Sequence, residues 1–92
     1  MVRYLRVVWH HDFEDEPILL LSEVVDGREV RKVERFRDGR VQFAGPDGAS
    51  GDTMLSETLM PLPHEIAQDP EFSVVPTSAE EFEAEWCAVV GE

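Results

Sequence analysis

The Asp-Gly dipeptides at residues 26–27 and 38–39 constrain the fold of this chain more than any other feature. Asp-Gly favours a two-residue turn between antiparallel strands, because both central residues of a type I′ turn need positive φ angles. Aliphatic or alternating segments lie before and after each dipeptide. The sequence therefore predicts strands over 18–25, 28–36 and 40–44, joined by two hairpins and preceded by a strand over 4–10.

The segment over 28–36 lacks the regular period of a strand. Its apolar residues Val30, Val33 and Phe36 are three apart, whereas side chains on one face of a strand recur every second residue. A β-bulge would reconcile this spacing with a sheet.

The chain after residue 44 is less regular. Residues 45–53 hold three glycines, one proline and two aspartates, which is typical of a loop. Phosphate binding is not expected there, because no lysine follows the glycines and the aspartates would repel an anion. We expect a short extended segment before Pro63, a helical turn over 64–68, and a short strand over 72–76.

The C-terminal segment is the clearest helix in the sequence. Ser78 and Glu81 form a capping-box pattern, which places the helix start at about Ala79. Apolar residues at spacings of three and four form one stripe, which is expected to cover the sheet rather than bind a partner. The stripe comprises Ala79, Phe82, Trp86 and Val89.

Ninety-two residues are enough for one small hydrophobic core and too few for two. We therefore expect a single domain over residues 1–92. Its predicted class is α+β: an antiparallel meander sheet of about four to five strands with the C-terminal helix packed on one face.

The net charge of -12 is unevenly distributed. All eight basic residues lie within residues 1–40 together with nine of the twenty acids, and residues 41–92 hold the other eleven acids and no base. Such a surface opposes binding to nucleic acid, which needs clustered cations. It suits a basic protein partner, although acidity can also serve solubility alone.

Several classes of protein are excluded by simple counts. The one cysteine, Cys87, permits neither an internal disulfide nor a multi-cysteine zinc site. The longest apolar stretch, 17–21, is far shorter than the roughly 20 residues of a membrane span, and no signal peptide is recognisable. We expect a cytoplasmic protein without a cofactor.

The stretch "VWHHDFEDEP", residues 8–17, contains two adjacent histidines and four carboxylates. Neighbouring side chains of a strand point to opposite faces, so His10 and His11 are not expected to share a metal ion. The simplest interpretation is a solvated loop between strands, in which His11 or Asp12 bonds the backbone. No catalytic or metal residue is predicted here.

Residues spread along most of the chain form a motif that can be recognised. The motif comprises Trp9 with a His-Asp pair, Asp15-Glu16-Pro17, then Glu29-x-Arg31-Lys32-Val33-Glu34-x-Phe36 and Asp38-Gly39-Arg40. With "DPEF" and the terminal "EEFEAEW", it resembles a family of small bacterial proteins recorded only as a domain of unknown function. The resemblance covers residues 4–86 and implies an ordered bacterial module, without catalytic residues to transfer.

Two classes of function fit the sequence. We favour a non-enzymatic acidic protein-binding module, such as an immunity or inhibitor protein, that docks on a basic partner through Glu80, Glu83 and Glu85. The alternative is a small enzyme or ligand-binding domain that uses the 10–15 loop together with a basic anion clamp. Its candidate residues are His10, His11, Asp12, Glu14, Asp15, Arg31, Lys32 and Arg35. The three bases can equally form ion pairs with neighbouring glutamates on a sheet face.

Overall fold

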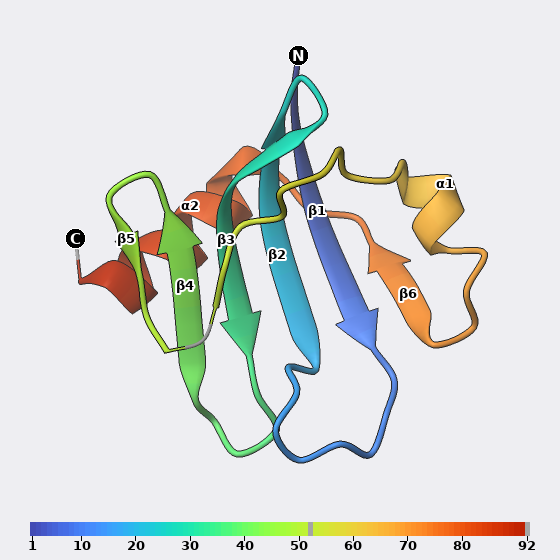
Figure 1. Ribbon diagram of the computed structural model, residues 1–92, viewed down its shortest axis with the longest axis horizontal. Coiled ribbons are helices and arrows are strands. Elements are labelled where there is room, and N and C mark those ends of the chain that lie inside the picture. The colour runs from blue at the N-terminus through green and yellow to red at the C-terminus, as the bar shows by residue number, and fades with distance from the viewer. Residues whose placement is uncertain (52, 92) are drawn as a thin grey trace.

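The computed structural model in Figure 1 describes residues 1–51 and 53–91. In these residues six strands form one antiparallel sheet in the order β5-β4-β3-β2-β1-β6. The strands are β1 (Val2–Trp9), β2 (Leu19–Val25), β3 (Arg28–Arg35), β4 (Val41–Gly45), β5 (Gly48–Ala49) and β6 (Phe72–Val75). The helices are α1 (Pro63–Ile66) and α2 (Ala79–Val90).

The predicted α+β class and the antiparallel meander are confirmed. Each of β1 to β5 pairs with its neighbour in sequence. Asp26 and Gly27 turn β2 into β3 with φ angles of 50° and 84°, as a type I′ turn requires. Gly39, at φ 95°, helps turn β3 towards β4. The two Asp-Gly signals thus mark the two hairpins that they predicted.

The irregular spacing in β3 has the expected origin. Glu23 pairs with Arg31 but Val24 pairs with Glu29, so the register shifts and Val30 has no partner on β2. This β-bulge lets Glu29 and Val33, four residues apart, lie on opposite faces of the sheet.

The expected count of four to five strands was wrong. The described residues form six, because Gly48 and Ala49 of the predicted 45–53 loop pair with β4 as β5. The remaining strand, β6, adds to the free edge of β1. One residue of that predicted loop, Asp52, lies outside the described residues.

Helix α2 packs on one face of the sheet. Ser78 accepts a hydrogen bond from the Glu81 N–H at the helix start, as predicted. Phe82 is 1% exposed and packs with Leu21 and Val33, and partly buried neighbours surround this cluster. These neighbours are Tyr4, Val41, Trp86 and Val89. Of the predicted stripe, Ala79 alone is exposed, because it lies in the first turn of the helix.

Residues 53–62, named here the crossing segment, lie over the opposite face of the sheet and lead into α1 (Figure 1). The expected extended segment before Pro63 is not a strand: the Met60 N–H bonds to the Gly27 carbonyl, at the tip of a hairpin, rather than to a strand edge. Met60 and Ile66 cover a second core cluster of Leu5, Val7 and Val24. The sheet is therefore covered on both faces, by a helix and by an irregular segment. Within the described residues, neither helix is long and apolar enough to cross a membrane.

Candidate functional site

The loop between β1 and β2 holds its two histidines apart. The Nδ1 atom of His11 accepts the Phe13 N–H at 2.9 Å, so the proton lies on Nε2, which donates to the Pro17 carbonyl at 2.8 Å. His10 instead contacts the Ser73 hydroxyl at 2.7 Å. Both ring nitrogens of His11 therefore serve the loop itself, which is the backbone-bonding role expected of it.

An aromatic stack supports this loop. Trp9 lies against the rings of His11 and Phe72, with centroid distances of 4.3 and 5.9 Å. Phe13 stacks on His11 at 5.4 Å and is 61% exposed. A large aromatic side chain is thus presented to solvent on a base of packed rings.

Four exposed carboxylates lie within three residues of Phe13 along the chain; they are Asp12, Glu14, Asp15 and Glu16. No ion pair found in residues 1–51 and 53–91 engages any of them. Cations lie nearby: Arg37 donates to the His11 carbonyl, and Lys32 and Arg40 line one cavity together with Asp15 and Glu16. The His10 N–H also bonds to the carbonyl of Glu71, whose side chain is exposed. This end of the sheet therefore carries a concentrated, largely uncompensated negative charge around one exposed ring.

The predicted anion clamp is divided between the two faces of the sheet. Arg31 and Arg35 face α2, whereas Lys32 faces the crossing segment, because adjacent strand residues alternate. Arg31 bonds Glu23 of β2 and Glu83 of α2, and its guanidinium lies over the Phe82 ring. The two arginines are therefore engaged in holding the helix on the sheet.

The three acids predicted to meet a partner have different environments. Glu83 and Glu85 are bonded to Arg31 and Arg35, and only Glu80 is exposed without an ion pair found among the described residues. Hydrogen bonds from Arg35 hold the pKa of Glu85 below its ordinary value, and those from Arg31 do the same for the pKa of Glu23. Burial opposes both pKa shifts but is the smaller effect.

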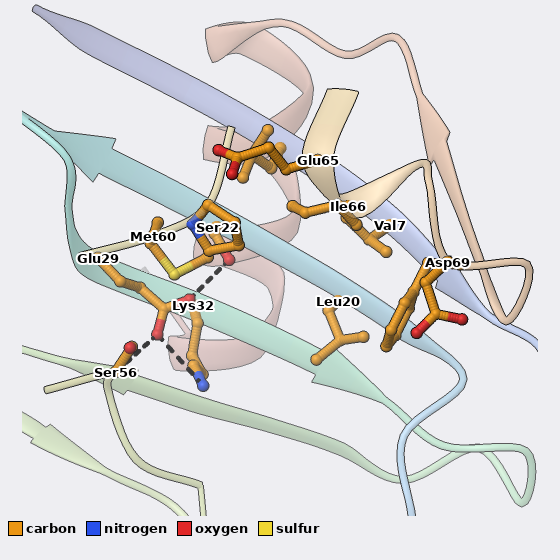
Figure 2. A pocket seen from close by; sticks show the side chains of 13 residues that line it. Val7, Leu20, Ser22, Glu29, Lys32, Ser56, Met60, Glu65, Ile66 and Asp69 are labelled. Atoms are coloured by element: carbon orange, nitrogen blue, oxygen red, sulfur yellow. Dashed lines mark hydrogen bonds and ion pairs between the residues drawn. The ribbon is translucent and has the colours of Figure 1, made fainter. Parts of the chain in front are cut away.

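A pocket of about 370 Å³ lies between the sheet and the crossing segment (Figure 2). It is named here the crossing pocket. Its floor comes from β1 and β2 and its cover from the crossing segment, α1 and β6. The apolar lining includes Leu5, Val7, Leu20, Met60, Ile66 and Phe72.

One side of the crossing pocket is polar. Glu29, 6% exposed, accepts hydrogen bonds from the Ser22 hydroxyl at 2.7 Å and the Ser56 N–H at 2.9 Å. The Lys32 Nζ lies 3.2 Å from the same carboxylate. Glu65 and Asp69 are exposed and line the pocket away from this group (Figure 2).

Sequence reasoning missed this pocket and also the exposure of Phe13. A signal existed for the polar group, because Ser22 interrupts the aliphatic run 18–25 at a position that a sheet buries. Its pairing with Glu29 depends on the bulge and could not be placed in advance. Among the described residues, no three His, Cys, Asp or Glu side chains are arranged to hold a metal ion.

Comparison with known proteins places the chain in a family. No curated protein and no solved structure was found to match it. A family model described as a domain of unknown function, DUF6881, matches residues 3–91, which is nearly the whole chain. This confirms the resemblance to a domain of unknown function, and the chain therefore belongs to the DUF6881 family.

Proposed function

We propose that the domain is a non-enzymatic module that binds a basic protein partner through the loop between β1 and β2. The docking surface consists of Phe13 and its four neighbouring carboxylates, and is named here the acidic loop surface; the carboxylates are Asp12, Glu14, Asp15 and Glu16. The observation that carries the proposal is the 61% exposure of Phe13 among carboxylates for which no ion pair is found in the part of the chain that the structure describes, residues 1–51 and 53–91.

The arrangement has the features of a binding hot spot. Aromatic residues at the centre of an interface supply much of the binding energy, and charged residues at the rim speed association and select the partner. Phe13 is the apolar centre, and its contacts with His11 and Trp9 limit the conformational freedom that binding would remove. A partner with Lys or Arg side chains around an apolar recess would complement this surface.

The distribution of ion pairs supports the loop over α2 as the docking surface. Glu85 of α2 is already paired with Arg35, and Glu83 shares Arg31 with Glu23, so the charge of both helix residues is at least partly compensated. Only Glu80 of the three predicted partner residues remains available in that region.

The alternative function, an enzyme or ligand site in the same loop, has less support. A histidine acts as an acid, a base or a metal ligand through a free ring nitrogen. Both nitrogens of His11 are bonded to the loop backbone, and His10 points to Ser73 instead of to Asp12. The geometry therefore favours binding by the loop over chemistry in it.

The test is selection of random peptides displayed on phage against the purified domain. The enriched peptides are expected to carry net positive charge with an apolar residue between Lys or Arg residues. Their affinity is expected to fall about tenfold or more in Phe13→Ala, as for a hot-spot residue. Leu59→Ala is the matched control, because Leu59 is 63% exposed and lies outside the loop.

A charge-matched pair of variants completes this test. Glu14→Gln/Glu16→Gln should slow association of the enriched peptides with the domain and weaken the salt dependence of that rate. Glu80→Gln/Glu81→Gln removes the same charge from α2 and should leave the association rate and its salt dependence unchanged. Enrichment of neutral or acidic peptides, or equal binding by Phe13→Ala and the wild type, would contradict the proposal.

A further inference from the structure

The crossing pocket adjoins the base of the acidic loop, because Phe72 lines the pocket and contacts Trp9, but it has a lining of its own and needs its own explanation. We propose that it is a binding site for a compact, uncharged and mainly apolar molecule that carries one hydrogen-bond acceptor, which the Lys32 ammonium would bind. This site lies on the sheet face that the crossing segment covers, and the inference does not depend on the proposed partner of the loop.

The size and lining of the pocket fit a small molecule. Its volume of about 370 Å³ lies within the range of roughly 300–1,000 Å³ that is usual for ligand sites. Leu5, Val7 and Leu20 form an apolar floor, and Met60, Ile66 and Phe72 form apolar walls. Such sites typically combine a hydrophobic lining with a few polar groups that orient the ligand.

The polar side of the pocket offers a donor that a ligand could use. The Glu29 carboxylate already accepts from the Ser22 hydroxyl and from the Ser56 N–H, and it forms an ion pair with the Lys32 ammonium at 3.2 Å. The Lys32 ammonium has three protons, and Glu29 is the one partner found for it in residues 1–51 and 53–91. A carbonyl or ether oxygen of a ligand would therefore meet an available N–H from Lys32.

The charges select an uncharged ligand. Glu29 and Lys32 compensate each other, so the polar side has no net charge. Glu65 and Asp69 add two negative charges at the exposed margin. An anionic ligand would approach these carboxylates unfavourably, and a charge of either sign would lose hydration in the apolar interior.

The presence of this ion pair in the pocket also points to a ligand. The side chains of Glu29 and Lys32 are 3% and 15% exposed. A buried ion pair generally stabilises a fold no better than well-packed apolar residues of similar volume. Here it borders an apolar cavity at the edge of the second core cluster, and a role in orienting a ligand accounts for the position of Lys32.

The experiment is a fluorescence titration with prodan, an uncharged naphthalene that bears one ketone. We expect saturable binding of one prodan per domain with a blue shift of its emission. Leu20→Trp, which fills the pocket from its floor, should weaken binding by about tenfold or more. The same substitution at an exposed leucine outside the pocket, Leu59→Trp, should change the affinity for prodan by no more than about twofold. Circular dichroism verifies that each variant is folded.

Two further measurements test the polar part of the proposal. An anionic naphthalene sulfonate should bind at least about tenfold more weakly than prodan. In Glu29→Gln/Lys32→Met, prodan should lose several-fold in affinity, whereas 2-dimethylaminonaphthalene, which lacks the ketone, should bind the variant and the wild type equally.

Three results would overturn the inference. These are the absence of saturable prodan binding to the wild type, equal binding by Leu20→Trp and Leu59→Trp, and binding of the sulfonate as tightly as prodan. If the Glu29→Gln/Lys32→Met variant lost affinity equally for prodan and for 2-dimethylaminonaphthalene, the role assigned to Lys32 would be wrong. None of these results bears on the acidic loop surface, so the two proposals fail independently.

Discussion

Arg35 of β3 donates two parallel hydrogen bonds, each 2.8 Å long, to the carboxylate of Glu85 on α2. This bidentate geometry is the strongest form of a side-chain ion pair and connects the helix directly to the sheet. Arg31 makes the corresponding connection to Glu83 and also bonds Glu23 of β2. A part of the acidity of this chain therefore stabilises the fold instead of serving a partner.

The stability of the domain should depend on pH through these pairs. The pKa of Glu85 and that of Glu23 are lowered in the folded state, chiefly by hydrogen bonds from arginine. The unfolded chain therefore binds protons at a higher pH than the folded one, so this stabilisation is present above the unfolded-state pKa of about 4.3. It is lost as pH falls from that value through the folded-state pKa.

Urea unfolding between pH 3 and pH 7, a range that spans the ordinary pKa of about 4.3, measures this effect. Glu85→Gln should be less stable than the wild type at neutral pH, and the difference should shrink as the pH falls. Glu80→Gln, an exposed position of the same helix, should follow the wild type. A deficit of Glu85→Gln that persists unchanged at the acidic end would show that the ion pair is not its cause.

The buried pair in the crossing pocket should behave as a unit. Lys32→Met leaves the Glu29 charge buried without its cation, which costs about 3–5 kcal/mol of unfolding free energy. Glu29→Gln/Lys32→Met removes both charges and should restore much of that loss. Denaturant titration of Lys32→Met, of Glu29→Gln and of the double variant gives the coupling energy. Strictly additive effects on the unfolding free energy would contradict a direct interaction.

Gly45 should be intolerant of a side chain because of the helix above it. A Cβ atom at this position would lie 2.7 Å from the Trp86 Cη2 atom. Gly45→Ala should therefore destabilise the domain by about 1–3 kcal/mol through overpacking. The same substitution in a Trp86→Phe background should cost clearly less, since the smaller ring makes room. Equal costs in the two backgrounds, measured by thermal or urea unfolding, would show that Trp86 is not the obstacle.

Truncation of two phenylalanines should affect the unfolding free energy to very different extents. Phe82 is 1% exposed between α2 and the sheet, and Phe82→Ala should cost about 3–5 kcal/mol of unfolding free energy. Phe13 is 61% exposed, and Phe13→Ala should cost about 1 kcal/mol or less. Unfolding curves measure both values. A loss of several kcal/mol in Phe13→Ala would mean that this ring serves the core rather than a docking surface.

The features that sequence alone predicted are those specified by nearby residues. The Asp26-Gly27 hairpin needs only a local turn geometry, and α2 needs only the Ser78 cap and the period of its apolar residues. Neither the crossing segment nor the position of β6 beside β1 has such a local signal. Both depend on which exposed face or edge remains free once the meander has formed.

The candidate site residues show the same division. Alternation over residues 31–35 of β3 separates Lys32 from Arg31 and Arg35, so a divided clamp could have been predicted from this part of the strand. The contact of Ser22 with Glu29 could not, because a bulge sets the register between their strands. The pairing of Glu85 with Arg35 likewise depends on the docking angle of α2.

The most direct test of the central proposal is an NMR titration of the ¹⁵N-labelled domain with a basic peptide enriched in the display selection. We predict that amide signals of residues 11–16 shift in a saturable manner and that the shifts decrease at high salt. Signals from α2, including those of residues 80–85, should remain in place. Saturable shifts that centre on α2, or that persist unchanged in Phe13→Ala, would contradict docking through the acidic loop surface.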